Sequence, residues 1–347
     1  MATNRRALLR TGLTVTAVGA AGLSLPNPAS AAPNSPTRVR PEAAPSIAGT
    51  DAWGARPASG TIQVLDSRPI KIIVHHTATS NSSDFSQAHA FALSRDIQDY
   101  HMDSNGWLDT GQHFTNSRGG WITEGRHRSL EVLNGGTRHV VSAHASGQNS
   151  VALGIENEGL YTGVDVPGQL WTSLVALCRY MCDQYRIRPS EIYGHRDFNS
   201  TECPGDVLYA RLSELRAAVG DAAGQLIPWP LLRLGDTGAR VTAAQHLLRA
   251  RGLTGVPTDG VYGPATEDAV RRFAVANNVP MEHCYASAHA DERGLLGAGT
   301  WPLLVTSVRA DDPGDAGRAV RALLTARGDR LAPTALIDTR GWRNLLT

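Results

Sequence analysis

The stretch Lys71-Ile-Ile-Val-His-His76 decides the fold, because a short apolar run that ends in polar residues predicts a buried β-strand. Residues 151–156 and 191–195 form two further short apolar runs and predict two more strands. Residues 112–117 and 121–124 flank an Arg-Gly-Gly turn, which indicates a β-hairpin. The chain therefore carries the strands of a central sheet.

Helical periodicity appears between these strands. Residues 84–101 place apolar side chains at helical spacing behind Ser82 and Ser83, which are candidate N-caps. Residues 169–185 predict a strongly apolar helix, and a final helix follows residue 195. This mixture predicts an α/β fold with a central mixed β-sheet flanked by helices. Sheets of this kind place their binding sites at strand ends.

Three potential metal ligands stand at such strand ends. His75 lies at the end of the first strand, and His195 and Cys203 bracket the segment that follows the last one. Imidazole and thiolate are ligands that zinc prefers, and a catalytic zinc site has three protein ligands and one open position. The spacing differs from that of a zinc finger, in which ligands come in pairs two to four residues apart. A single histidine at a strand end is more often structural, so the prediction of a zinc hydrolase depends on the surrounding residues.

The surrounding residues form seven blocks. In the order in which they occur, these blocks resemble those of the zinc N-acetylmuramoyl-L-alanine amidases in the type-2 amidase and peptidoglycan recognition protein superfamily. The resemblance covers residues 50–219, and it implies an amidase domain that binds one zinc ion through His75, His195 and Cys203. The blocks are Trp53-Gly-Ala-Arg56, Val74-His-His-Thr-Ala-Thr79, Gly106-Trp-Leu-Asp-Thr-Gly111, Glu124-Gly-Arg126, Ser142-Ala-His144, Gly154-Ile-Glu156, and Gly194-His-Arg-Asp197 with Cys203-Pro204.

The resemblance also implies catalytic residues. Glu156 matches the position of a catalytic glutamate in the cytoplasmic recycling branch of the family and is the expected proton shuttle. Glu158 is its rival, because the period of two in a strand places both on one side. Other branches use a tyrosine where this chain has Gln112, which cannot act as an acid or base. Thr201 is expected to donate a hydrogen bond to the oxyanion.

The remaining site predictions concern the substrate groove. The resemblance places His144 in the groove, and Trp107 and Arg126 are candidates to contact sugar or peptide beside Gln112. Aromatic residues in such positions are more often part of the core. His76 should point to the other side of its strand from His75 and is expected to be structural.

The C-terminal part of the chain has a different character. After a Pro-rich linker at residues 220–231, residues 232–306 resemble the small all-α, three-helix peptidoglycan-binding domain of type 1, interrupted by an insert at residues 281–293. Residues 307–347 are predicted to be a degenerate half-repeat that packs on this domain, with an ordinary helical tail as the alternative. The resemblance depends on Leu234-Gly-Asp-Thr-Gly238, Asp259-Gly-Val-Tyr-Gly263 and Gly297-Ala-Gly-Thr-Trp301.

The first residues predict export. Residues 1–31 have the pattern of a twin-arginine signal peptide, with Arg5 and Arg6 before a modestly apolar stretch and Ala-Ser-Ala at the end. That stretch is too short to span a membrane stably, and residues 32–49 should form a flexible leader. The protein is therefore expected to be secreted to the cell wall by the twin-arginine route, without a membrane span after cleavage.

The balance of charged residues excludes one class of partner. Without residues 1–31 the chain has 30 Lys and Arg against 32 Asp and Glu, because three of the 33 basic residues lie in that segment. This nearly even balance argues against nucleic acid as a partner.

Cys178 and Cys182 lie four residues apart on a predicted helix, which suits buried thiols better than a disulfide. The pairing of Cys284 stays open.

Three classes of function remain. The first is an amidase, expected to be a monomer, that cuts between N-acetylmuramic acid and the L-alanine of the peptidoglycan stem peptide. The second is a non-catalytic peptidoglycan receptor, although receptors of the family that lack zinc have lost the cysteine that is Cys203 here. The third is a zinc peptidase that acts on another cell-wall amide.

Overall fold

The computed structural model describes residues 44–220, 227–282, 291–330 and 335–347. All of these belong to one compact unit, residues 42–347. The predicted signal peptide, most of the predicted leader and Cys284 lie outside the described residues.

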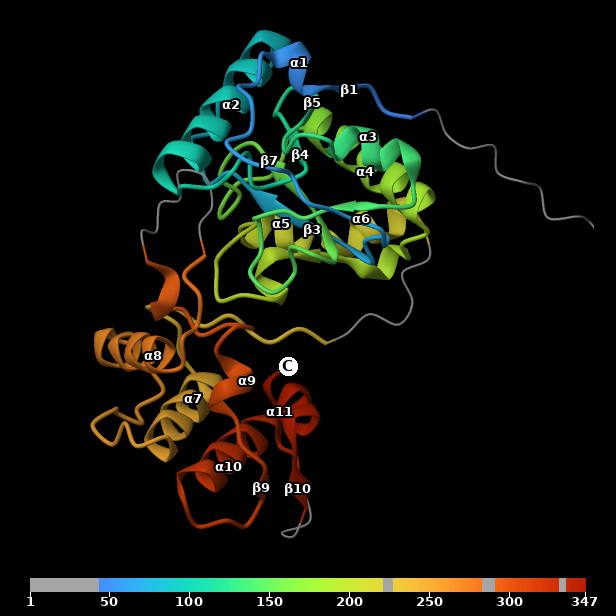
Figure 1. The fold of residues 1–347 in the computed structure, drawn as a ribbon. Coiled ribbons are helices and arrows are strands. Elements are labelled where there is room, and N and C mark those ends of the chain that lie inside the picture. The colour runs from blue at the N-terminus through green and yellow to red at the C-terminus, as the bar shows by residue number, and fades with distance from the viewer. Residues whose placement is uncertain (1–43, 221–226, 283–290, 331–334) are drawn as a thin grey trace, which may run out of the picture. The chain divides into compact units, whose positions relative to one another are not determined.

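A six-stranded mixed sheet forms the centre of the N-terminal part, as the sequence predicts (Figure 1). Its strand order is β1-β5-β4-β7-β3-β8. Neighbouring strands are parallel except for the hairpin of β4 and β5. The strands are β1 (Ile47–Ala48), β3 (Lys71–His76), β4 (Phe114–Asn116), β5 (Ile122–Glu124), β7 (Ala152–Asn157) and β8 (Ile192–Gly194), and a separate antiparallel pair consists of β2 (Val64–Leu65) and β6 (His139–Val140).

Helices cover the sheet. The apolar face of α4 contributes Leu170, Leu174 and Leu177 to a core that also contains Ile72 and Ile155 from the sheet. The helices of this part are α1 (Thr50–Trp53), α2 (Gln87–Asp99) with a π-helical turn η1 (Tyr100–Ser104), α3 (Ser129–Gly135), α4 (Gly168–Tyr185), α5 (Asp206–Ala210) and α6 (Leu212–Val219), with short 3-10 turns η2 (Pro189–Glu191) and η3 (His195–Asp197).

Two local predictions are corrected. The N-cap of α2 is Ser86, whose hydroxyl accepts from the backbone N–H of His89 at 3.1 Å, and neither Ser82 nor Ser83 is the cap. The sheet also begins before residue 50, because β1 pairs in parallel with β5. The last residues of the predicted flexible leader therefore form an edge strand.

The C-terminal part is mainly helical, and the described residues between 232 and 306 form three α-helices. A single hydrophobic core runs from Trp229 to Leu346, and it includes both Trp301 and Trp342. The indole N–H of Trp342 donates to the carbonyl of Thr306 at 2.7 Å. The elements are α7 (Ala239–Ala250), α8 (Pro264–Ala276), the 3-10 turn η4 (Glu292–Gly294), α9 (Trp301–Leu304), β9 (Val308–Arg309), α10 (Asp315–Arg327), β10 (Leu336–Ile337) and α11 (Thr339–Leu346).

Two further findings concern the described residues alone. None of their helices is long and apolar enough to cross a membrane. Cys178 and Cys182 are buried free thiols, as predicted.

Candidate functional site

Three neighbouring parallel strands present polar side chains on one face of the sheet. The register pairs His75 of β3 with Glu156 of β7, and Glu156 with Thr115 of β4. Residues paired in parallel strands point to the same face, and side chains alternate along each strand. The preceding residues, among them Val74 and Ile155, enter the helix-covered core on the other face. The sequence alternation therefore brings His75, Glu156 and Thr115 together.

The loop after β8 brings two more groups to this face. His195 opens the turn η3, and the backbone N–H of Arg196 donates to the carbonyl of Cys203 at 3.0 Å. The carboxylate of Asp197 accepts from the N–H of Gly194 at 2.9 Å and from the hydroxyl of Tyr209 at 2.5 Å. These contacts fix the direction in which the loop leaves the strand.

The predicted metal ligands meet at this point. His75, His195 and Cys203 are all buried, and each offers one ligand atom within 4.8 Å of those of the other two. The Nδ1 atom of His75 lies 3.6 Å from the Sγ atom of Cys203. Nitrogen and sulfur ligands of a tetrahedral zinc ion, bound at ordinary lengths, are about 3.6 Å apart. Two imidazoles and one thiol at this spacing fit zinc.

The charge state of His75 also suits a ligand. Burial lowers the pKa of His75 well below its ordinary value, and neighbouring His195 and His144 lower it further. A metal ligand must be the neutral imidazole, which has a free lone pair. The site therefore holds His75 in the form that binds metal.

His144 determines which ring nitrogen of His75 carries the hydrogen and which one has an available lone pair. Burial lowers the pKa of His144 to about 3, so its ring is neutral and carries one N–H. Its Nε2 lies 3.2 Å from the carbonyl of Ala152, which can only accept. Its Nδ1 therefore accepts from Nε2 of His75 at 2.9 Å, which leaves the lone pair of His75 Nδ1 directed toward Cys203. Gly154 makes room for this ring, because a Cβ there would lie 2.5 Å from it.

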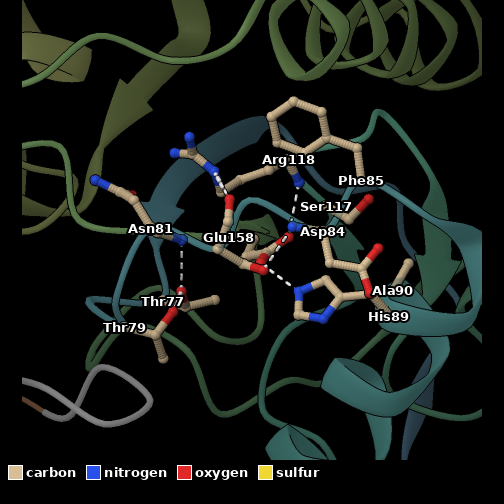
Figure 2. A network of polar contacts seen from close by, with 12 residues as sticks. Thr77, Thr79, Asn81, Asp84, Phe85, His89, Ala90, Ser117, Arg118 and Glu158 are labelled. Atoms are coloured by element: carbon tan, nitrogen blue, oxygen red, sulfur yellow. Dashed lines mark hydrogen bonds and ion pairs between the residues drawn. The ribbon is translucent and has the colours of Figure 1, made fainter.

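The two candidate proton shuttles have different surroundings. Glu156 is 4% exposed and lies beside His75 in the sheet register. Glu158 follows the end of β7, where one carboxylate oxygen lies 2.6 Å from Nε2 of His89 and the other accepts from the backbone N–H of Arg118 at 2.7 Å (Figure 2). The contacts of Glu158 anchor the hairpin loop to α2, so the geometry favours Glu156 as the group that acts at the metal.

Thr201 and Gln112 are also buried. The hydroxyl oxygen of Thr201 accepts from the N–H of Cys203 at 3.1 Å, which leaves its hydrogen available for donation. The Nε2 atom of Gln112 donates to Thr115 at 2.8 Å, next to Glu156 in the register. Among the described residues its Oε1 atom has no hydrogen-bond partner.

The structure places the other predicted groove residues in two different environments. Trp107 and His144 line a cavity of about 220 Å³, together with Ser146 and Glu282. Arg126 is 5% exposed, and its guanidinium donates to the carbonyls of Thr110 at 2.8 Å and Val141 at 3.0 Å. These contacts give Arg126 a structural role, and its role in binding substrate stays a prediction. His76 is buried. Its structural role stays a prediction.

Sequence reasoning missed Glu282. Its carboxylate lies 3.3 Å from Nε2 of His195 and accepts from the side-chain amide of Asn199 at 2.7 Å. The residue belongs to the insert at residues 281–293, and no sequence spacing links it to the metal ligands.

Comparison with known proteins gives two family matches. The model described as N-acetylmuramoyl-L-alanine amidase matches residues 65–206, and the model described as a putative peptidoglycan binding domain matches residues 237–281. Peptidoglycan-recognition protein SC2 of Drosophila simulans is 33% identical over 45% of this chain and 79% of its own length. The N-acetylmuramoyl-L-alanine amidase of Homo sapiens is 32% identical over 45% of this chain and 26% of its own length.

Solved structures of a peptidoglycan recognition protein and of an amidase are also similar to this chain. The structure of Drosophila PGRP-LB matches 52% of this chain and 99% of its own, with a TM-score of 0.44 and 25% identity. The N-acetylmuramoyl-L-alanine amidase LysC from Clostridium intestinale URNW matches 50% of this chain and 96% of its own, with a TM-score of 0.39 and 28% identity.

Proposed function

The chain belongs to the family of N-acetylmuramoyl-L-alanine amidases and peptidoglycan recognition proteins, and we propose that it is a zinc-dependent amidase. The bond it cuts joins the lactyl group of N-acetylmuramic acid to the L-alanine of the stem peptide. The observation that carries this proposal is the meeting of His75, His195 and Cys203, with Glu156 next to His75 in the sheet register. A receptor that only binds peptidoglycan would need neither the buried thiol nor the adjacent carboxylate.

Each residue has one part in the reaction. Zinc, when bound by these three ligands, supplies a Lewis acid that polarises the scissile carbonyl and acidifies water. Glu156 takes the proton of the attacking water and returns it to the leaving amine. Thr201 donates its hydroxyl hydrogen to the developing oxyanion. His144 keeps the lone pair of His75 directed into the site.

The remaining parts of the proposal concern where the reaction takes place. Residues 232–306, with residues 307–347 packed on the same core, tether the monomeric enzyme to the cell wall. Tethering raises the local concentration of substrate without new catalytic contacts. Residues 1–31 direct export of the protein by the twin-arginine route.

The direct test is the chemistry of the product. Full-length protein loaded with zinc is incubated with purified peptidoglycan, and the digest is analysed by mass spectrometry. Cleavage at the proposed bond should release stem peptides with a free N-terminal L-alanine. Free amino groups at another residue would indicate a peptidase, and binding without any cleavage would indicate a receptor.

His144 provides a separate prediction. His144→Ala removes the acceptor of the N–H of His75, so His75 is free to adopt the other tautomer and ring orientation. Loss of such a supporting partner typically costs about 10- to 100-fold in metal affinity. We expect a loss of this size when zinc affinity is measured by competition with a chelator. His144→Gln, which offers an amide oxygen as acceptor, should recover part of it. Unchanged zinc affinity in His144→Ala would show that the ring does not position His75.

A further inference from the structure

Both described ends of the insert contact the loop that carries two metal ligands. Glu282 precedes the part of the insert outside the described residues and contacts Asn199, whereas Glu292 follows it and accepts from the N–H of Glu202 at 3.1 Å. Glu282 and Glu292 are 8% and 5% exposed. Two buried carboxylates of the helical C-terminal part thus lie against residues 195–203.

Other contacts connect the same loop to the helical C-terminal part. The hydroxyls of Ser200 and Thr300 are 2.9 Å apart, and Arg233 donates to the carboxylate of Glu202 at 2.8 Å. The side chain of Glu282 therefore belongs to a surface that contacts the loop through several hydrogen bonds, and the position of its carboxylate is defined by more than one contact.

Glu282 contacts the ring of His195 from outside the cluster of metal ligands. Its Oε2 atom lies 3.3 Å from Nε2 of His195, and its Oε1 atom accepts from the side-chain amide of Asn199 at 2.7 Å. The potential metal ligands that come together among the described residues are His75, His195 and Cys203, and this group does not include Glu282. The carboxylate is therefore placed to act on the metal centre through His195.

This contact determines which nitrogen of His195 can bind a metal ion. A carboxylate oxygen can only accept a hydrogen bond, so Nε2 carries the ring hydrogen when it faces Glu282. In the neutral ring the other nitrogen, Nδ1, then has the free lone pair. His144 has the same relation to His75, whose Nε2 donates and whose Nδ1 is directed toward Cys203. Both supporting groups, His144 and Glu282, line the cavity of about 220 Å³.

We propose that Glu282 is a positioning residue of the metal centre, which accepts the hydrogen of His195 Nε2 and so keeps Nδ1 as the ligand atom. The inference rests on the proposed function, because it takes His195 as one of the three zinc ligands. A carboxylate on the second nitrogen fixes the tautomer and the ring orientation of a metal-binding histidine and raises its basicity. The helical C-terminal part of the chain thereby supports the metal centre, in addition to its proposed attachment to the wall.

The first test measures the zinc affinity of the full-length chain by competition with a chelator. Loss of such a supporting partner typically costs about 10- to 100-fold in metal affinity, and we expect a loss of this size in Glu282→Ala. Glu282→Gln keeps an oxygen that can accept and should recover part of it. Glu292→Ala is the matched control, because it truncates a buried carboxylate of the same insert that accepts from a backbone N–H of the loop. It should bind zinc as the wild type does.

The second test observes the ring of His195 in the zinc-loaded protein by proton–nitrogen NMR correlation. In the wild type the ring should carry its hydrogen on Nε2, and this hydrogen should exchange slowly with water because it is buried and hydrogen-bonded. Exchange should be faster in Glu282→Ala and unchanged in Glu292→Ala. A residue that supported only the fold of the loop would not change the exchange of this one hydrogen.

Three results would overturn the inference and leave the amidase proposal intact. Wild-type zinc affinity in Glu282→Ala would show that the carboxylate does not support His195. Equal losses of affinity in Glu282→Ala and Glu292→Ala would mean that both residues act only by holding the insert against the loop. A ring hydrogen on Nδ1 of His195 would mean that the other nitrogen binds the metal. Failure of the wild-type chain to bind zinc would instead overturn the proposed function.

Discussion

His75→Ala and Cys203→Ser should each remove zinc from the purified protein and abolish hydrolysis together with it. Each change removes one of the three buried ligands, and the two that remain are too few to hold a zinc ion stably. Metal content measured by mass spectrometry should fall from about one zinc per chain in the wild type to near zero in both variants. Turnover of soluble muropeptide should be lost in parallel.

Cys182→Ser is the matched control for this pair. Cys182 is also a buried free thiol, but it belongs to α4 and packs in the helix-covered core. We expect it to retain full zinc content, with at most a modest loss of stability. Full zinc content in Cys203→Ser would mean that the metal centre has been assigned to the wrong residues.

Glu156→Gln should lower turnover by about 10² to 10⁴ while zinc content stays at the wild-type level, since this is the usual contribution of a positioned acid or base. The amide keeps the size and polarity of the carboxylate but cannot carry a proton. Stopped assays with soluble muropeptide measure the loss, and metal analysis of the same preparation shows that the site is intact.

Glu158→Gln is the control, because Glu158 is a buried carboxylate two residues away whose oxygens contact His89 and Arg118. Weakening hydrogen bonds of a buried charged group costs about 1–3 kcal/mol of the free energy of unfolding, so thermal denaturation should show a lower midpoint. Turnover below the midpoint should stay near wild type. Loss of turnover in Glu158→Gln, with Glu156→Gln unaffected, would transfer the proton shuttle to Glu158.

Local sequence patterns were enough to predict the elements that build the site. The run at Lys71–His76 and the helix at Gly168–Tyr185 are confirmed because each has a continuous apolar signal that depends on its own residues. The ligand triad could be predicted from residue types and the order of the blocks, and the structure places its three members together. Alternation along the strand predicted only that Glu156 and Glu158 lie on one side, whereas the pairing of Glu156 with His75 is visible in the register of the sheet.

Features that depend on distant partners could not be predicted. The pairing of Ile47 and Ala48 with β5 is a backbone contact between short strands, and two residues are too few for a periodic signal. The N-cap at Ser86 was missed because Ser82 and Ser83 are equally good cap residues and only the path of the loop selects among them. The contact between Glu282 and His195 joins residues 87 positions apart, so no local pattern includes both.

The single core that runs from Trp229 to Leu346 has a consequence for how the C-terminal part loses its structure. Helix α10 packs against α7, and His246 of α7 contacts the carboxylate of Asp315 at 2.8 Å, so the two segments share one buried interior. Neither can open alone without exposing apolar surface of the other. We therefore expect residues 232–306 and 307–347 to unfold together as one cooperative unit, so that residues 307–347 are as necessary to this unit as the residues that precede them.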